Sequence, residues 1–129
     1  RDRRYVLMGR RKGAHGAGEM SFPGGWIDLE DESIDDTCCR EVREETGLII
    51  KGTRRLIETT STYPGPPPFR TITLFRWTAS FTGEATLVEP AKCEGWLWHD
   101  LARPVVFDST TYFGGVRAAL YALEKEVRP

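Results

Sequence analysis

Strand-forming patterns occupy much of this chain. The clearest is the run of β-branched and aromatic residues at 71–81, TITLFRWTASF, which predicts a strand. Further strands are predicted at residues 4–9, 95–99 and 48–60, the last with a break near Lys51 and Gly52. Residues 63–68, YPGPPP, predict a rigid loop, because proline has no backbone N–H to donate within a central strand. The other predicted loops are residues 10–20, 82–92 and 100–108.

Helical periodicity predicts two helices. The first covers residues 34–46, with Ser33 as its N-cap, Asp36 as a capping-box-like partner and Gly47 as the residue that ends it. Its apolar stripe, expected on the side away from the acidic residues, consists of Ile34, Cys38 and Val42. The second helix covers residues 112–127. Its apolar face consists of Val116, Ala119, Leu120 and Leu123. Strands and helices interleave irregularly, so a mixed sheet flanked by helices follows.

Three glutamates of the first predicted helix share one face. Glu41, Glu44 and Glu45 stand at i, i+3 and i+4. Like charges at that spacing repel and destabilise a helix unless something neutralises them. Hard divalent cations such as Mg²⁺ prefer carboxylate oxygen, and commonly bind one or two protein carboxylates together with substrate phosphates. The cluster therefore predicts a site for a divalent metal ion.

The surrounding segment resembles the box that defines the Nudix family. That pattern is Gly, five residues, Glu, seven residues, Arg-Glu, an aliphatic residue, any residue, Glu-Glu, any residue, Gly and an aliphatic residue. The right half, from Glu32 through Arg40 to Leu48, fits throughout. The left half is one residue longer, since six residues separate Gly25 from Glu32. We interpret the extra residue as an insertion in the loop at 28–31, before the helix.

The resemblance implies a fold and an activity. The fold is an α/β/α sandwich with a mixed β-sheet, formed by a single Nudix domain over residues 1–129. Nudix domains usually have a further strand before the one expected at residues 4–9, so we expect an N-terminal strand to be lacking. The implied activity is Mg²⁺-dependent hydrolysis, with Mn²⁺ as an alternative ion, of a phosphoanhydride bond in a nucleoside diphosphate linked to another moiety.

The resemblance also implies roles for individual residues. Glu41, Glu44 and Glu45 are the expected metal ligands, and any of them could instead be the general base. The carbonyl of Gly24 would complete the metal shell. Arg40 would pair with a carboxylate, with Glu32 as the first choice, and so orient the box. The candidates for a further carboxylate from outside the helix are Glu89 and Glu94.

The substrate features point in two directions. Residues 89–98 and 7–18 resemble the MutT-like branch, which hydrolyses nucleoside triphosphates. Pro64 lies sixteen residues after Leu48, near where ADP-ribose-cleaving relatives often carry a proline. We favour a nucleoside triphosphate, cleaved to monophosphate and pyrophosphate, over ADP-ribose or a nucleotide sugar. A domain that binds or senses a nucleotide without cleaving it is the alternative from another class.

Aromatic residues supply candidates for stacking on a nucleobase. They are Phe22, Tyr63, Phe69, Trp96 and Phe113. Because Trp96 and Trp98 alternate along a strand, we expect only one of them to face the site. His15 lies in the glycine-rich loop, where it could contact a phosphate or a base.

Composition narrows the class of partner. The net charge of −1 over 129 residues argues against nucleic acid. The odd cysteine count, with Cys38 and Cys39 adjacent, forms neither a disulfide framework nor a zinc spacing, which suits a reducing cytoplasm. No apolar run approaches the roughly 20 residues that span a bilayer. We expect a small-molecule nucleotide partner, no membrane and no nucleic acid, and leave a homodimer open.

Overall fold

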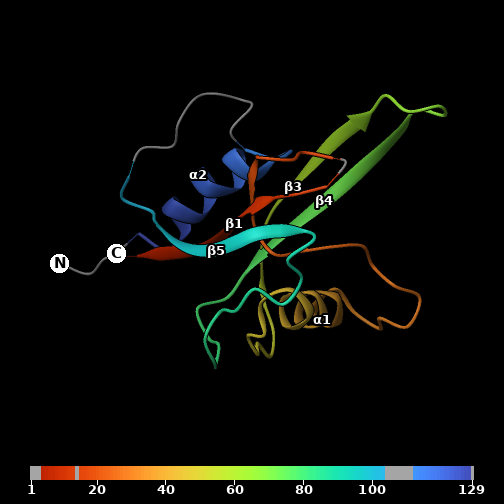
Figure 1. The fold of residues 1–129 in the computed structure, drawn as a ribbon. Helices are drawn as coiled ribbons and strands as arrows, with labels where there is room; N and C mark the ends of the chain where they lie inside the picture. Colours follow the sequence, from red (N-terminus) through yellow and green to blue (C-terminus); the bar gives the residue numbers. More distant parts are fainter. Residues whose placement is uncertain (1–3, 14, 104–111, 129) are drawn as a thin grey trace.

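The computed structural model describes residues 4–13, 15–103 and 112–128, which form seven elements. In chain order they are β1 (Tyr5–Arg11), β2 (Met20–Ser21), α1 (Ile34–Thr46), β3 (Arg54–Tyr63), β4 (Phe69–Trp77), β5 (Cys93–Asp100) and α2 (Val116–Glu126). Figure 1 shows the two helices on opposite sides of β1 and β5. Part of the loop predicted at 100–108 lies outside the described residues.

The strands form two antiparallel groups. β1 lies between β2 and β5, and β3 pairs with β4 as a long hairpin. A parallel bridge between Met20 and Tyr112 adds the segment before α2, so the pairing is mixed. The predicted fold class, an α/β sandwich with a mixed sheet, is confirmed.

The predicted elements exist, with some bounds displaced. α1 has the predicted limits, while the strand expected at 71–81 is β4 and ends at Trp77. There the hydroxyl of Thr78 accepts a hydrogen bond from the backbone N–H of Ser80, which turns the chain. The glycine-rich loop is shorter than predicted, because β1 continues to Arg11 and Met20 pairs with Arg10.

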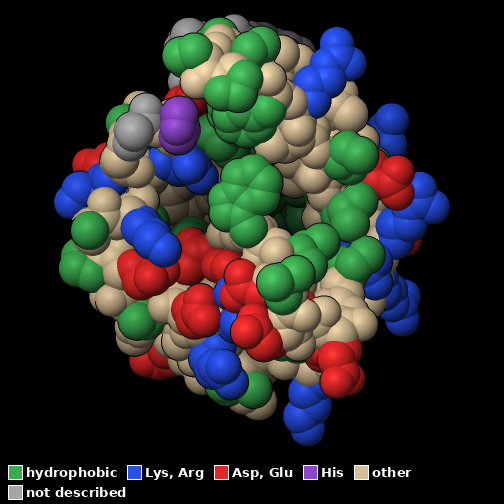
Figure 2. Space-filling model, turned by 90° about the vertical axis from the view of Figure 1, so that its right-hand side faces the viewer, with side chains coloured by type: hydrophobic (Ala, Val, Ile, Leu, Met, Phe, Trp, Pro, Cys, Tyr) green, Lys and Arg blue, Asp and Glu red, His purple; other side chains and the backbone are tan. Residues whose placement is uncertain are grey.

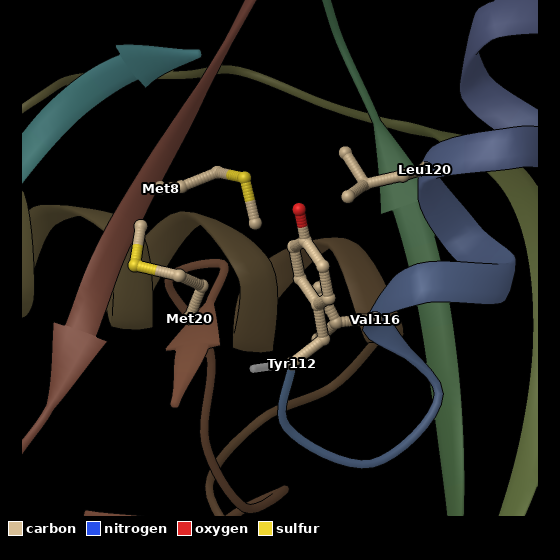
Figure 3. Close-up of a cluster of buried hydrophobic side chains, with 5 residues drawn as sticks. All are labelled: Met8, Met20, Tyr112, Val116 and Leu120. Atoms are coloured by element: carbon tan, nitrogen blue, oxygen red, sulfur yellow. The ribbon is translucent and has the colours of Figure 1, made fainter. Parts of the chain in front are cut away.

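The core lies between β1 and α2. Figure 3 shows its cluster of buried side chains, which consists of Met8, Met20, Tyr112, Val116 and Leu120. The apolar face predicted for α2 is confirmed, since all four of its residues are buried. Burial of such side chains is the main favourable term in folding. This packing fixes β1 and, through the register of Gly9 with Trp96, also β5.

The helix α1 is capped as predicted. The Ser33 side chain accepts a hydrogen bond from the backbone N–H of Asp36 at 3.1 Å. The Asp36 carboxylate in turn accepts from the backbone N–H of Glu32, one residue before the N-cap. Gly47 ends the helix at φ 77°, a left-handed conformation that glycine adopts without a steric penalty.

The prediction of which residues of α1 are buried is wrong. Ile34 is exposed, and Cys38 and Val42 are only half-buried. The buried residues of the helix are Thr37 and Thr46. Their hydroxyls are satisfied locally, by the carboxylate of Asp31 and by the carbonyl of Val42. The predicted stripe is only partly covered, since Ile34 lines an open groove together with Ile57 of β3 and Phe75 of β4.

Candidate active site

Two consecutive glycines lie against the carboxylates of α1. The backbone N–H of Gly24 donates to Glu45 Oε1 at 3.0 Å. A Cβ added to Gly25 would lie 2.4 Å from the carboxyl carbon of Glu41. No real Cβ approaches a heavy atom so closely, so a larger residue at position 25 would force the loop or the Glu41 carboxylate to move. The loop before the helix and the last turns of the helix thus form one site.

Glu45 is a carboxyl group of this site with a strongly raised pKa. Its pKa is raised to about 7, first by burial and then by the charge and hydrogen bonding of Glu41 and the charge of Glu89, while the hydrogen bond from the Gly24 N–H opposes the rise. A buried carboxylate that faces a second carboxylate binds a proton or another cation more tightly than an exposed one does. The pair Glu41 and Glu45 therefore has the chemistry of a cation site.

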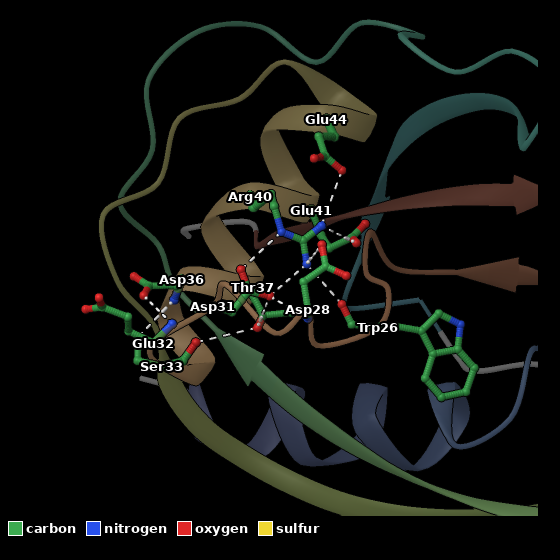
Figure 4. Close-up of polar contacts among 10 residues, drawn as sticks. All are labelled: Trp26, Asp28, Asp31, Glu32, Ser33, Asp36, Thr37, Arg40, Glu41 and Glu44. Carbon is green, nitrogen blue, oxygen red and sulfur yellow. Dashed lines mark hydrogen bonds and ion pairs between the residues drawn. The ribbon is translucent and has the colours of Figure 1, made fainter.

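Arg40 holds the other acidic groups together. Its Nη2 donates to Asp31 Oδ2 at 2.8 Å, and its Nη1 contacts Glu41 Oε1 at 2.8 Å and Glu44 Oε2 at 3.4 Å. The carbonyl of Trp26 accepts a further bond from Nη2 at 3.0 Å. Figure 4 shows this guanidinium at the centre of the network. It orients two of the three box glutamates.

The expected pairing of Arg40 with Glu32 is wrong. The partner is Asp31, whose two carboxylate oxygens accept from Nε at 3.2 Å and from Nη2 at 2.8 Å. Arg40 holds the pKa of Asp31 well below its usual range, while Asp31 and Glu41 raise the pKa of Arg40. Glu32 is exposed. The sequence did contain a signal: five residues separate Gly25 from Asp31, which is the family spacing.

Of the two loop carboxylates, the structure brings Glu89 to the site. Its charge contributes to the raised pKa of Glu45, and its side chain pairs with Lys92 at 3.3 Å. The pKa of Lys92 is raised, mainly by Glu89 and to a smaller extent by the charges of Glu45 and Glu41. Glu94 is exposed on β5, and no described contact joins it to the glutamates of α1.

The two tryptophans of β5 correct another expectation. We expected only one of them to face the site, but residues two apart in a strand point to the same face of the sheet. Trp96 and Trp98 therefore lie on the same face. Trp96 Nε1 donates to the carbonyl of Glu45 at 3.1 Å, and Trp98 stacks on Phe81. Trp96 therefore supports the end of α1. Among the other aromatic candidates, Tyr63 packs against His15 and Phe69; Phe22 packs against Phe75, and Phe113 against the Arg11 guanidinium.

One face of the molecule gathers acidic side chains at a hollow. Figure 2 shows them along one edge of the depression, beside hydrophobic groups. The two grooves with volumes of about 350 and 280 Å³ lie elsewhere: the first includes Ile34 and Arg76, and the second includes Tyr5 and His99. Within the described part of the chain, no three acidic, histidine or cysteine side chains converge as a ready-made metal cage.

A model of the NUDIX domain matches residues 1–112, which include the entire site. The chain belongs to the Nudix family. The MutT NUDIX hydrolase of Burkholderia pseudomallei has a similar structure, with a TM-score of 0.75 and 27% identity over 92% of this chain and 88% of that one. The NUDIX domain of Shewanella oneidensis NrtR, solved with ADP ribose, has a TM-score of 0.70 at 20% identity, covering 95% of this chain and 77% of that domain.

The sequence likeness to a curated Nudix relative is local. Human mitochondrial coenzyme A diphosphatase NUDT8 is 41% identical over 46 residues. That segment is 36% of this chain and 20% of the relative, so this chain matches only a fifth of the relative's length. Neither helix of this Nudix chain, within its described residues, is long and apolar enough to cross a membrane.

Proposed function

We propose that this protein is a divalent-metal-dependent hydrolase of phosphoanhydride bonds in nucleoside diphosphates linked to another moiety. The observation that carries the proposal is the half-buried pair of carboxylates, Glu41 and Glu45, beside the backbone of Gly24 and Gly25. Their mutual repulsion favours the binding of a cation, and phosphate oxygens are the natural remaining ligands of such a cation. Membership of the Nudix family supports the same chemistry.

The residues present fit Mg²⁺ or Mn²⁺. The donors are hard carboxylate oxygens, and two of them suffice for an ion that takes its other ligands from water and phosphate. When bound, the metal would neutralise phosphate charge and lower the pKa of a bound water. We assign the binding to Glu41 and Glu45, with Glu44 and the carbonyl of Gly24 as further ligands.

The remaining acidic residues take supporting roles in this proposal. Arg40 keeps Glu41 and Glu44 in place, and Asp31 keeps Arg40 in place through its paired hydrogen bonds. Glu89 lies close enough to influence Glu45. We assign to Glu89, rather than Glu94 or Glu32, the role of the additional carboxylate. It would accept a proton from water or share in cation binding.

A nucleoside triphosphate is the substrate that we favour. The MutT hydrolase of Burkholderia pseudomallei matches along nearly its whole length. The second candidate is a nucleotide-linked diphosphate such as coenzyme A or ADP-ribose. The short match to the coenzyme A diphosphatase favours it, as does the position of Pro64. All of these substrates present a diphosphate to the same carboxylates.

A substrate panel tests the proposal. The purified protein is incubated with Mg²⁺ and nucleoside triphosphates, ADP-ribose, nucleotide sugars or coenzyme A, and the products are separated by chromatography. We expect hydrolysis of at least one compound, and a loss of at least 100-fold in kcat for Glu45→Gln. Tight binding without any product would instead identify a sensor domain, and full activity of the variant would refute the metal assignment.

A further inference from the structure

Trp26 differs from the other tryptophans in having its ring uncovered. The residue is 72% exposed. The other three have partners: Trp96 donates to Glu45, Trp98 stacks on Phe81, and Trp77 lies beneath the guanidinium of Arg54. For Trp26, no ring contact is found within the described residues. A tryptophan side chain is usually well buried. An exposed aromatic surface of this size indicates that a ligand or partner covers it.

The backbone that carries Trp26 is held rigidly. Three consecutive residues contact side chains of α1: Gly24 donates to Glu45, Gly25 packs on Glu41, and the Trp26 carbonyl accepts from Arg40. Figure 4 shows the indole directed away from Arg40 and its partners. The side chain thus projects from a backbone that is already anchored beside the carboxylates, so a ligand that packs on the indole does not have to order the loop.

We propose that Trp26 is a stacking surface for the nucleobase of the substrate. This inference rests on the proposed function, because it takes the phosphates to lie at Glu41 and Glu45. In a nucleotide anchored there, only the sugar separates the base from the phosphates. Trp26 directly follows Gly25, the residue that contacts Glu41. Stacking of a base on an aromatic ring tolerates different bases, because each presents a flat π-face.

Binding of analogues that resist hydrolysis tests this assignment. The ligands are α,β-methylene-ADP and, as its base-free counterpart, methylenediphosphonate, each titrated calorimetrically with Mg²⁺. We expect Trp26→Ala to weaken the binding of α,β-methylene-ADP by roughly 5- to 100-fold, the effect of losing one stacked base. Binding of methylenediphosphonate should be unchanged, and Trp26→Phe should keep most of the affinity.

Ile27→Ala is the matched control, since Ile27 is a neighbouring side chain that is also largely exposed, at 61%. It should leave both affinities unchanged, and thermal unfolding should show that every variant is folded. An unchanged affinity of Trp26→Ala for the nucleotide analogue, an equal loss for both ligands, or an equal loss in Ile27→Ala would overturn the assignment. Absence of turnover in the substrate panel would refute the hydrolase, but not a binding result obtained with these analogues.

Discussion

At the scale of single residues, the site depends on which carboxylates share a proton, a cation or a guanidinium. Glu45 is half-buried beside Glu41, while Glu44 is more exposed and contacts Arg40 at 3.4 Å. Three glutamates that look equivalent in the sequence therefore occupy different environments. The differences between them lead to separate measurements.

The first prediction concerns Glu45 and pH. Its folded-state pKa of about 7 lies above the ordinary value of 4.5, so the metal-free folded protein holds a proton that the unfolded chain releases. The contribution of this proton to the free energy of unfolding is fully present below about pH 4.5 and is lost as the pH rises toward 7. The loss amounts to about 3 kcal/mol at most. Urea unfolding in a chelator should show this decline, and Glu45→Gln should abolish it, whereas Glu94→Gln should retain it.

The second prediction distinguishes Asp31 from Glu32. Asp31→Asn removes the charge that holds Arg40, so Glu41 and Glu44 lose their orientation. We expect kcat or Mg²⁺ affinity to fall by roughly 10- to 100-fold, as for other residues that orient metal ligands. Glu32→Gln should change both by less than about twofold, since the carboxylate of Glu32 is exposed. Equal effects of the two substitutions would contradict the observed pairing.

At the scale of elements, the site is the junction of one loop with one helix. The loop at 22–32 contacts α1 through Gly24, Gly25 and Trp26. From the helix, the side chain of Arg40 contacts the loop. Caps at Ser33 and Gly47 fix the helix ends. Beyond this junction, Trp96 of β5 contacts the end of the helix through the carbonyl of Glu45. The position of the loop on the helix is therefore the sensitive part of the site.

The third prediction tests that position with two neighbouring glycines. In Gly25→Ala, the added methyl group would collide with the Glu41 carboxylate, so either the loop or the carboxylate must move. We expect a loss of stability of about 1–3 kcal/mol and a fall in activity of at least tenfold. Gly24→Ala is the control, because no atom lies within 4 Å of the added Cβ. Chemical unfolding and kinetics of the two variants should differ, and similar losses in both would argue against close packing at Gly25.

At the scale of the whole molecule, the packing of β1 on α2 is apolar, whereas the attachment of α1 is largely polar. The buried cluster from Met8 to Leu120 stabilises the first of these regions. Around α1, carboxylates, threonines and Arg40 replace the apolar stripe. Cation binding at the carboxylates should therefore be detectable in the stability of the whole domain.

The fourth prediction concerns the effect of Mg²⁺ on thermal unfolding. A ligand that binds only the folded state raises its stability in proportion to the logarithm of ligand concentration. We expect Mg²⁺ to raise the Tm at pH 8, and to raise it less at pH 5, where a proton competes for Glu45. A chelator should reverse the rise. The rise should persist in Glu94→Gln but vanish when Glu41 and Glu45 are both replaced by glutamine; if it survives in that double variant, the ion binds elsewhere.

The sequence by itself determined α1, its caps, the apolar face of α2 and the candidate cluster of glutamates. These features depend on neighbours within about four positions along the chain, so local spacing is sufficient to predict them. Only the tertiary structure decided that Asp31 pairs with Arg40, that Glu89 rather than Glu94 approaches Glu45, and that α1 buries threonines. Those outcomes depend on how loops that are far apart in the chain lie against one helix. Burial and electrostatic interactions are set by distances in space, which sequence spacing does not give.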